Sequence, residues 1–148
     1  MEISSTDIEI IVRLGSATVL GGLIGFEREL HGKVAGFRTH SLVALGSALI
    51  MLVSVHIFIM YQGSVSVDPS RIAAQVVTGI GFLGAGTIIR FPTGVKGLTT
   101  AAGLWTASGI GLACGLGYFR AAFIATVITL LVLVVFSWIG RRLGARDV

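Results

Sequence analysis

Residues 121–140 read AAFIATVITLLVLVVFSWIG, twenty positions without a charged side chain. An α-helix rises about 1.5 Å per residue, so about 20 residues cover the roughly 30 Å hydrocarbon core of a bilayer. Outward from this segment, four more apolar segments of similar length fill most of the 148-residue chain. The five predicted spans cover residues 8–26, 41–61, 72–89, 98–117 and 121–140. The predicted fold class is all-α: a polytopic membrane helix bundle of five transmembrane helices, forming a single domain over residues 1–148.

The composition excludes a water-soluble globular domain. Charged residues make up only 12% of the chain and the mean hydropathy is +0.94, so too few polar side chains remain to cover a soluble surface. The first seven residues carry Glu2 and Asp7, unlike the basic start of a secretory signal peptide, and we expect no cleavage. The chain stops eight residues after the last predicted span, so we expect no C-terminal cytosolic domain.

The basic residues predict the orientation. With five spans, eight of the eleven Lys and Arg residues fall in the linker after span one, the linker after span three and the C-terminal tail. Because cytoplasmic loops carry an excess of Lys and Arg, the N-terminus is predicted outside and the C-terminus in the cytoplasm. The net charge of +4 does not indicate nucleic-acid binding, since the cations flank spans instead of forming a stripe. Their predicted partners are anionic lipid headgroups of the inner leaflet.

Glycine and other small residues predict how the helices pack. Small residues recur at every fourth position in spans one and four, which lets helix backbones approach closely in lipid. Spans one and four should therefore be central, whereas span five is bulky and apolar on all sides and should face lipid. The predicted helix-packing residues are Gly21, Gly25, Gly79, Gly81, Gly84, Gly86, Gly103, Gly111 and Gly115.

The third span contains GIGFLG at residues 79–84, which matches the dinucleotide-binding pattern GxGxxG. That pattern needs a preceding strand and an acidic residue about 20 positions later. No Asp or Glu occurs between Asp68 and Asp147, so nucleotide binding is excluded here. Two interpretations stay open: close helix packing, or a locally unwound helix whose backbone lines a polar site, as in transporters.

Two groups of polar residues are candidate sites. Arg13, His56 and Gln75 lie at similar depth in spans one, two and three, and could form an outer polar cluster; snorkelling of Arg13 and pairing with Glu9 would explain it without function. On the cytoplasmic side, two carboxylates beside cations exceed what membrane anchoring requires, although ordinary anchors and helix caps are the alternative. This predicted cytoplasmic patch comprises Glu27, Arg28, Glu29, Arg38, Thr39, His40, Arg90, Lys96, Thr99 and Thr100. Leu30, Val34 and Phe37 stand at helical spacing and predict a short interfacial helix there.

At these residues the chain resembles the MgtC/SapB family of bacterial inner-membrane proteins. The motifs that carry the resemblance are residues 13–14, 21–29, 35–40, 81–86, 96–105 and 115–117. The resemblance implies a multi-pass protein of the bacterial inner (plasma) membrane, linked to adaptation to low Mg²⁺ and, in pathogens, to survival in host cells through restraint of the F-type ATP synthase. Thr99 and Thr106 stand where some members have Asn and Cys, and the short C-terminus favours the SapB-like branch.

The sequence is compatible with more than one class of function. The leading hypothesis is a non-enzymatic regulator that contacts another inner-membrane protein. The alternative is a homo-oligomeric transporter or channel for an ion or small solute. An enzyme is not predicted, because no nucleophile, paired-carboxylate or metal-ligand spacing appears. No metal site or cofactor is predicted either: hard cations such as Mg²⁺ prefer carboxylate ligands, no Asp or Glu lies at mid-membrane depth, and the single Cys114 is read as a packing residue.

Overall fold

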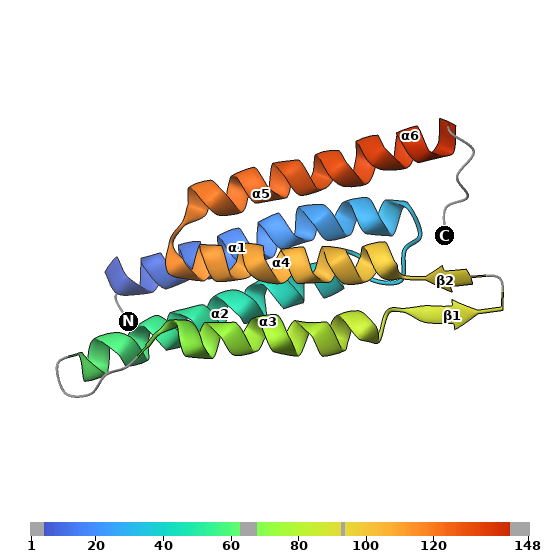
Figure 1. The fold of residues 1–148 in the computed structure, drawn as a ribbon. Coiled ribbons are helices and arrows are strands. Elements are labelled where there is room, and N and C mark those ends of the chain that lie inside the picture. Colours follow the sequence, from blue (N-terminus) through green and yellow to red (C-terminus); the bar gives the residue numbers. More distant parts are fainter. Residues whose placement is uncertain (1–4, 63–67, 93, 143–148) are drawn as a thin grey trace.

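The computed structural model describes residues 5–62, 68–92 and 94–142. Over these residues the chain forms helical rods that run side by side in alternating directions (Figure 1). The rods are α1 (Ser5–Leu30), α2 (Phe37–Tyr61), α3 (Ser70–Ala85) and α4 (Leu98–Leu116), followed by a last rod in which α5 (Phe119–Leu131), the π-helical segment η1 (Val132–Phe136) and α6 (Ser137–Arg142) follow end to end. Strands β1 (Ile89–Phe91) and β2 (Gly94–Lys96) form an antiparallel hairpin between α3 and α4.

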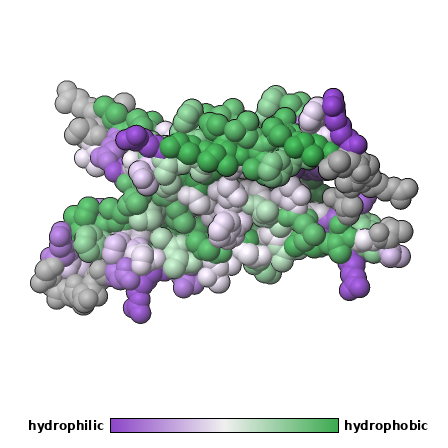
Figure 2. Space-filling model, turned by 45° about the horizontal axis from the view of Figure 1, so that its top comes forward, coloured by the Kyte–Doolittle hydropathy of each residue, from purple (hydrophilic) through white to green (hydrophobic). Residues whose placement is uncertain are grey.

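The helices have the dimensions and surface of membrane segments. Three of the described helices are long and apolar enough to cross a bilayer: Thr6–Leu30, Phe37–Tyr61 and Phe119–Gly140. Helix α3 has 16 residues and α4 has 19, rich in Gly, Ala and Thr. Figure 2 shows hydrophobic side chains over the middle of the bundle and hydrophilic ones gathered toward its two ends. The chain is therefore a helical membrane protein.

Helix α1 begins at one end of the bundle and α6 ends at the other (Figure 1). The end that carries the β1–β2 hairpin also contains the turn between α1 and α2, the start of α4 and the end of α6. We call it the hairpin end, made up of residues 27–40, 86–100 and 137–142. The hairpin end brings together the linkers after the first and third predicted spans, which carry five of the eleven Lys and Arg residues.

The core lies where α1, α2 and α4 meet. Ala17, Ala44, Ala48 and Cys114 are fully buried there, so small side chains hold the backbones of the three helices close together. The predicted central position of spans one and four agrees with this packing, but α2 is equally central. The α5 rod packs on α4 and α1 from outside, and its apolar surface is mostly exposed, as predicted for span five.

A few polar groups connect the helices. Ser47 Oγ of α2 donates to Ser108 Oγ of α4 at 3.1 Å, and both serines are buried. Ser54 Oγ donates to the carbonyl of Pro69 at the start of α3. These bonds satisfy hydroxyl groups that would be costly to leave unpaired in an apolar surrounding.

Asp68 binds the first residue of α3. Its Oδ1 accepts hydrogen bonds from the backbone N–H and the hydroxyl of Ser70, at 2.9 and 2.7 Å. These two bonds lower the pKa of the Asp68 carboxyl. Pro69 is the N-cap residue, and α3 begins at Ser70.

The structure differs from two predictions near the hairpin end. Span three was expected to be helical to residue 89, but α3 ends at Ala85 because the chain turns there, with Thr87 donating its N–H and its hydroxyl to the Gly84 carbonyl. The predicted interfacial helix is also absent from the described residues 31–36. Gly32, with φ at +61°, ends α1 in a turn, and Leu30 and Val34 are exposed on either side of it.

Candidate functional site

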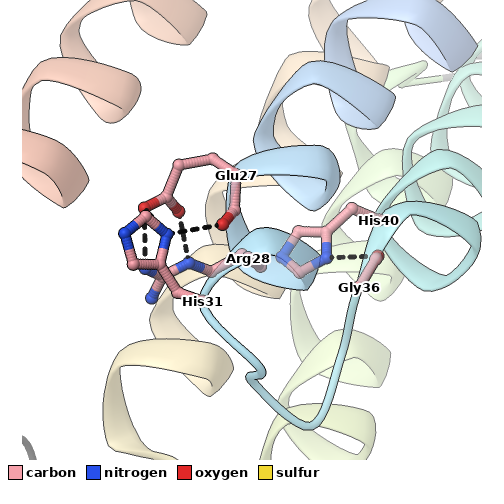
Figure 3. Close-up of polar contacts among 5 residues, drawn as sticks. All are labelled: Glu27, Arg28, His31, Gly36 and His40. Carbon is pink, nitrogen blue, oxygen red and sulfur yellow. Dashed lines mark hydrogen bonds and ion pairs between the residues drawn. The ribbon is translucent and has the colours of Figure 1, made fainter.

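Glu27 and Arg28 form a buried ion pair in the last turns of α1. Arg28 Nε donates to Glu27 Oε2 at 2.6 Å, and Arg28 Nη2 donates to Glu27 Oε1 at 3.1 Å. The two residues are only 8% and 3% exposed. Figure 3 shows both side chains turned to the same side, with His31 completing the group: its Nδ1 lies 3.0 Å from Glu27 Oε1 and 2.9 Å from the Glu27 carbonyl oxygen. Because the carboxylate and the guanidinium lie side by side, the negative charge of Glu27 and the positive charge of Arg28 compensate each other.

Glu29 has a different role, although only one residue separates it from Glu27. Its Oε2 accepts a hydrogen bond from the backbone N–H of Phe37 at 2.8 Å. It therefore satisfies one of the free N–H groups at the start of α2, and ties the end of α1 to the next helix across the turn. The two predicted carboxylates do not form a pair.

His40 belongs to α2, lies against α1 and α4, and is fully buried. Its Nδ1 is 3.0 Å from the carbonyl oxygen of Gly36, one turn earlier in the chain (Figure 3). Its Nε2 has no hydrogen-bond partner among the described residues. It faces Gly103 of α4, where a Cβ would lie 3.2 Å away. Gly103 therefore makes room for this imidazole.

A pocket of about 520 Å³ opens beside the Glu27–Arg28 pair. We call it the basic pocket. One side of it is polar and cationic, and the other is an apolar wall from η1. Its lining residues are Arg28, Gly32, Lys33, Val34, Lys96, Gly97, Thr99, Thr100, Val132, Leu133, Phe136 and Ser137.

The structure divides the predicted cytoplasmic patch. Arg28, Lys96, Thr99 and Thr100 line the basic pocket, with Glu27 behind Arg28. Arg38 and Arg90 are exposed outside it, and Thr39 lines a groove between α2 and α3. The sequence did not identify Lys33, Ser137 or the η1 wall as part of this site. Lys33 stands in the same linker as Arg28, but nothing in the sequence pattern marked the η1 segment as its neighbour.

The predicted outer polar residues share no hydrogen bond or ion pair in the described parts of the chain. Arg13 Nη1 donates to the Gly115 carbonyl oxygen at 2.6 Å, and Nη2 pairs with Glu9. His56 and Gln75 are exposed. Gln75 lines the α2–α3 groove. Arg13 thus joins α1 to the end of α4, instead of forming a cluster with the other two residues.

The glycines predicted to pack fall into three sets. Gly21, Gly25, Gly111 and Gly115 lie directly against neighbouring backbones: a Cβ on Gly21 would be 2.6 Å from Ala44 Cβ, and one on Gly115 would be 2.5 Å from the Ala48 carbonyl. Gly103 faces His40 and Gly84 faces Ala101, while Gly86 meets only the carbonyls of its own helix end. Gly79 and Gly81 have nothing within 4 Å of a Cβ position. Packing of these two within the chain is not observed, because they stand on an exposed face of α3.

Acidic and metal-binding side chains are dispersed. No group of three or more His, Cys, Asp or Glu residues that could hold a metal ion occurs among the described residues.

Comparison with known proteins gives a family match over most of the chain. The model of the MgtC family matches residues 14–142. The protein named "Putative magnesium transporter YhiD" of Escherichia coli (strain K12) is 48% identical over 141 residues, covering 94% of this chain and 66% of YhiD. Protein SapB of Bacillus subtilis (strain 168) is 39% identical, covering 93% of this chain and 61% of SapB. Protein MgtC of Salmonella typhimurium (strain LT2) is 46% identical, covering 90% of this chain and 55% of MgtC.

The chain spans less than two thirds of the length of each of these relatives. Their names describe a transporter or state no activity, and none describes an enzyme. No solved structure is significantly similar to the chain.

Proposed function

This chain belongs to the MgtC family, and on that premise we propose that it is a non-enzymatic regulator that contacts another inner-membrane protein during adaptation to low Mg²⁺. The F-type ATP synthase, which the family resemblance implies as a target, is the first partner to test.

The observation that carries this proposal is the unpacked small-residue face of α2 and α3. Gly46, Gly79 and Gly81 have nothing within 4 Å of a Cβ position, although the glycines of α1 and α4 that face α2 are tightly covered. Gly46 and Gly79 line a groove of about 780 Å³ whose wall is almost entirely apolar. Small residues that are open to the surroundings let a second helix approach closely in a bilayer. The groove therefore suits a transmembrane helix of a partner protein.

The proposal includes a topology of five spans with the N-terminus outside and the C-terminus in the cytoplasm. The opposite positions of the start of α1 and the end of α6 support an odd number of crossings (Figure 1). The concentration of basic residues at the hairpin end supports placing this end on the cytoplasmic side of the membrane. At about 1.5 Å per residue, the 16 residues of α3 reach about 24 Å, which requires local thinning of the bilayer or a flanking segment to complete the span.

The alternative is a homo-oligomeric transporter, favoured by the name of YhiD. The centre of the single bundle is filled by Ala17, Ala44, Ala48, Ile110 and Cys114, all at most 2% exposed. A pathway would therefore have to run between protomers. Flux of Mg²⁺ into liposomes that contain only this protein, abolished by Arg90→Ala at an exposed position, would favour the alternative.

Photo-crosslinking tests the regulator. A photoreactive amino acid at Leu83, which lines the groove, is expected to crosslink an ATP synthase subunit in cells grown at low Mg²⁺. The same amino acid at Ile124, exposed on α5, serves as the control and should crosslink no protein. Crosslinks at Leu83 to copies of this chain only, or to no protein at all, would refute the regulator.

A matched pair of substitutions separates function from folding. Gly79→Leu and Gly15→Leu both place a side chain in open space, so both proteins should fold. Only Gly79→Leu should lose the crosslink from Leu83 to the ATP synthase subunit in cells grown at low Mg²⁺. Equal loss in both variants would contradict a role for the groove.

A further inference from the structure

Thr100 carries a hydroxyl group at the wall of the basic pocket. Thr100 is 3% exposed, lines the basic pocket, and its side chain makes no hydrogen bond to any described residue. A hydroxyl that is not paired within the protein can donate one hydrogen bond to a bound molecule. Because it faces a pocket, a ligand that accepts a hydrogen bond would satisfy it.

Three cationic side chains also line the pocket: Arg28 is buried, Lys33 is half-buried, and the exposed Lys96 has its Nζ 5.5 Å from the centre of the Phe91 ring. Arg28 uses two of its five N–H donors on Glu27, and its side chain makes no further hydrogen bond within the described residues. Lys33 and Lys96 reach the pocket from the α1–α2 turn and from β2. Glu27 compensates Arg28, so the two lysines leave the pocket with a net positive charge.

The start of α4 adds a third contribution. Gly97, with φ at +93°, is its N-cap residue, and no side chain caps the helix. The first N–H groups of an α-helix have no partner within the helix, and the helix dipole favours negative charge at that end. Thr99 and Thr100 belong to this first turn and line the pocket. Cations, a helix start and an unpaired hydroxyl together fit a phosphate group.

The opposite wall of the pocket indicates which molecule carries the phosphate. Val132, Leu133 and Phe136 of η1 line it, and π-helical turns inside α-helices often occur at functional sites. Free phosphate would leave this apolar wall against water, whereas a phospholipid would place its headgroup on the lysines and its glycerol and first methylenes on η1. We propose that the basic pocket binds the phosphate headgroup of an anionic phospholipid. This inference depends on the proposed function only in placing the hairpin end at the membrane surface.

Native mass spectrometry of the delipidated protein in detergent tests the inference, with phosphatidylglycerol, phosphatidylcholine and inorganic phosphate as separate probes. Phosphatidylglycerol should bind best. The double variant Lys33→Gln/Lys96→Gln should weaken the binding of phosphatidylglycerol about ten- to thirtyfold, since each basic residue near an anionic surface contributes about 1 kcal/mol.

The matched control is Arg38→Gln/Arg90→Gln, which removes the same charge from exposed residues of the hairpin end outside the pocket. It should bind phosphatidylglycerol like the unmodified protein. Thr100→Val should weaken binding severalfold and Thr100→Ser should restore it, with circular dichroism confirming that each variant is helical.

Three results would overturn the proposal: equal weakening in both double variants, no change in either, or equal affinity for phosphatidylcholine. Binding of inorganic phosphate with the affinity of phosphatidylglycerol would overturn the lipid as its source. Lipid binding is measured on the purified protein, so it can hold even if no regulatory partner exists, and it can fail while crosslinking at Leu83 succeeds.

Discussion

Glu27 and Arg28 are ionised side chains at the edge of an apolar bundle, and each depends on the other. Truncating one partner of a buried pair leaves an uncompensated charge, which costs about 3–5 kcal/mol. We expect Glu27→Gln to lower the free energy of unfolding by an amount at the lower end of this range, because the amide can still accept one hydrogen bond. Thermal unfolding in lipid-free detergent measures the change.

The double variant Glu27→Gln/Arg28→Gln is the control, because it removes both charges. It should be more stable than Glu27→Gln alone. If the double variant loses as much stability as Glu27→Gln and Arg28→Gln lose together when measured singly, the two side chains do not act as a pair.

Arg13, unlike Glu27 and Arg28, has a partner that lies far away in the sequence. Its bond to the Gly115 carbonyl joins α1 to the last turn of α4, where the helix has carbonyl groups without partners. Arg13→Gln should destabilise the protein by about 1.5–3 kcal/mol, the range for hydrogen bonds to charged groups. The exposed partner Glu9 should matter less, and Glu9→Gln should cost about 1 kcal/mol or less. A larger effect from Glu9 would show that the local ion pair, and not the contact with α4, determines the role of Arg13.

At the scale of helices, α4 offers a matched comparison of two glycines. A Cβ on Gly111 would overlap the carbonyl of Ala44 in α2, whereas Gly109 has nothing within 4 Å. Gly111→Ala should therefore destabilise by about 1–3 kcal/mol through overpacking. Gly109→Ala should be neutral or stabilise by up to about 1 kcal/mol, because Ala favours helix over Gly. Thermal unfolding of both variants in one detergent gives the comparison, and equal effects would mean that α2 and α4 do not pack as described.

The α1–α2 turn and the β1–β2 hairpin show what determines the element boundaries. Apolar spacing at Leu30, Val34 and Phe37 predicted a helix, but Gly32 and the hydrogen bond from Phe37 N–H to Glu29 turn the chain instead. Likewise, apolar residues continue past Ala85 to Ile89, and the hairpin pairs Ile89 with Lys96. Hydrophobic spacing does not distinguish a helix end from a short strand when the segment is only a few residues long.

For the whole molecule, cysteine labelling tests the proposed topology. The only native cysteine, Cys114, is fully buried and should give no signal, so Cys114→Ala is a suitable background. Val34→Cys lies at the hairpin end, while Gln62→Cys and Tyr118→Cys lie at the opposite end, all at exposed positions. In intact spheroplasts, a membrane-impermeant maleimide should label only the last two. Labelling of Val34→Cys from outside, or of only one of the other two, would contradict five spans with a cytoplasmic hairpin end.

The sequence alone determined that this is a helical membrane protein of the MgtC family, and that the first and fourth spans pack through small residues; it did not identify α2 as their equal partner. Long apolar segments have few alternatives in a bilayer, because every backbone polar group must be bonded within the segment. Fourfold spacing of small residues likewise marks a packing face within one helix, as Gly111 and Gly115 show.

Only the tertiary structure decided which polar residues meet. It separated Glu27 from Glu29, removed Arg38 and Arg90 from the pocket, left Gly79 and Gly81 open, and added Lys33 and the η1 wall. The physical reason is that these contacts depend on how far each helix is rotated about its axis and where each helix ends. Both are set by packing against α2 and α4, and local spacing in the sequence carries little information about either.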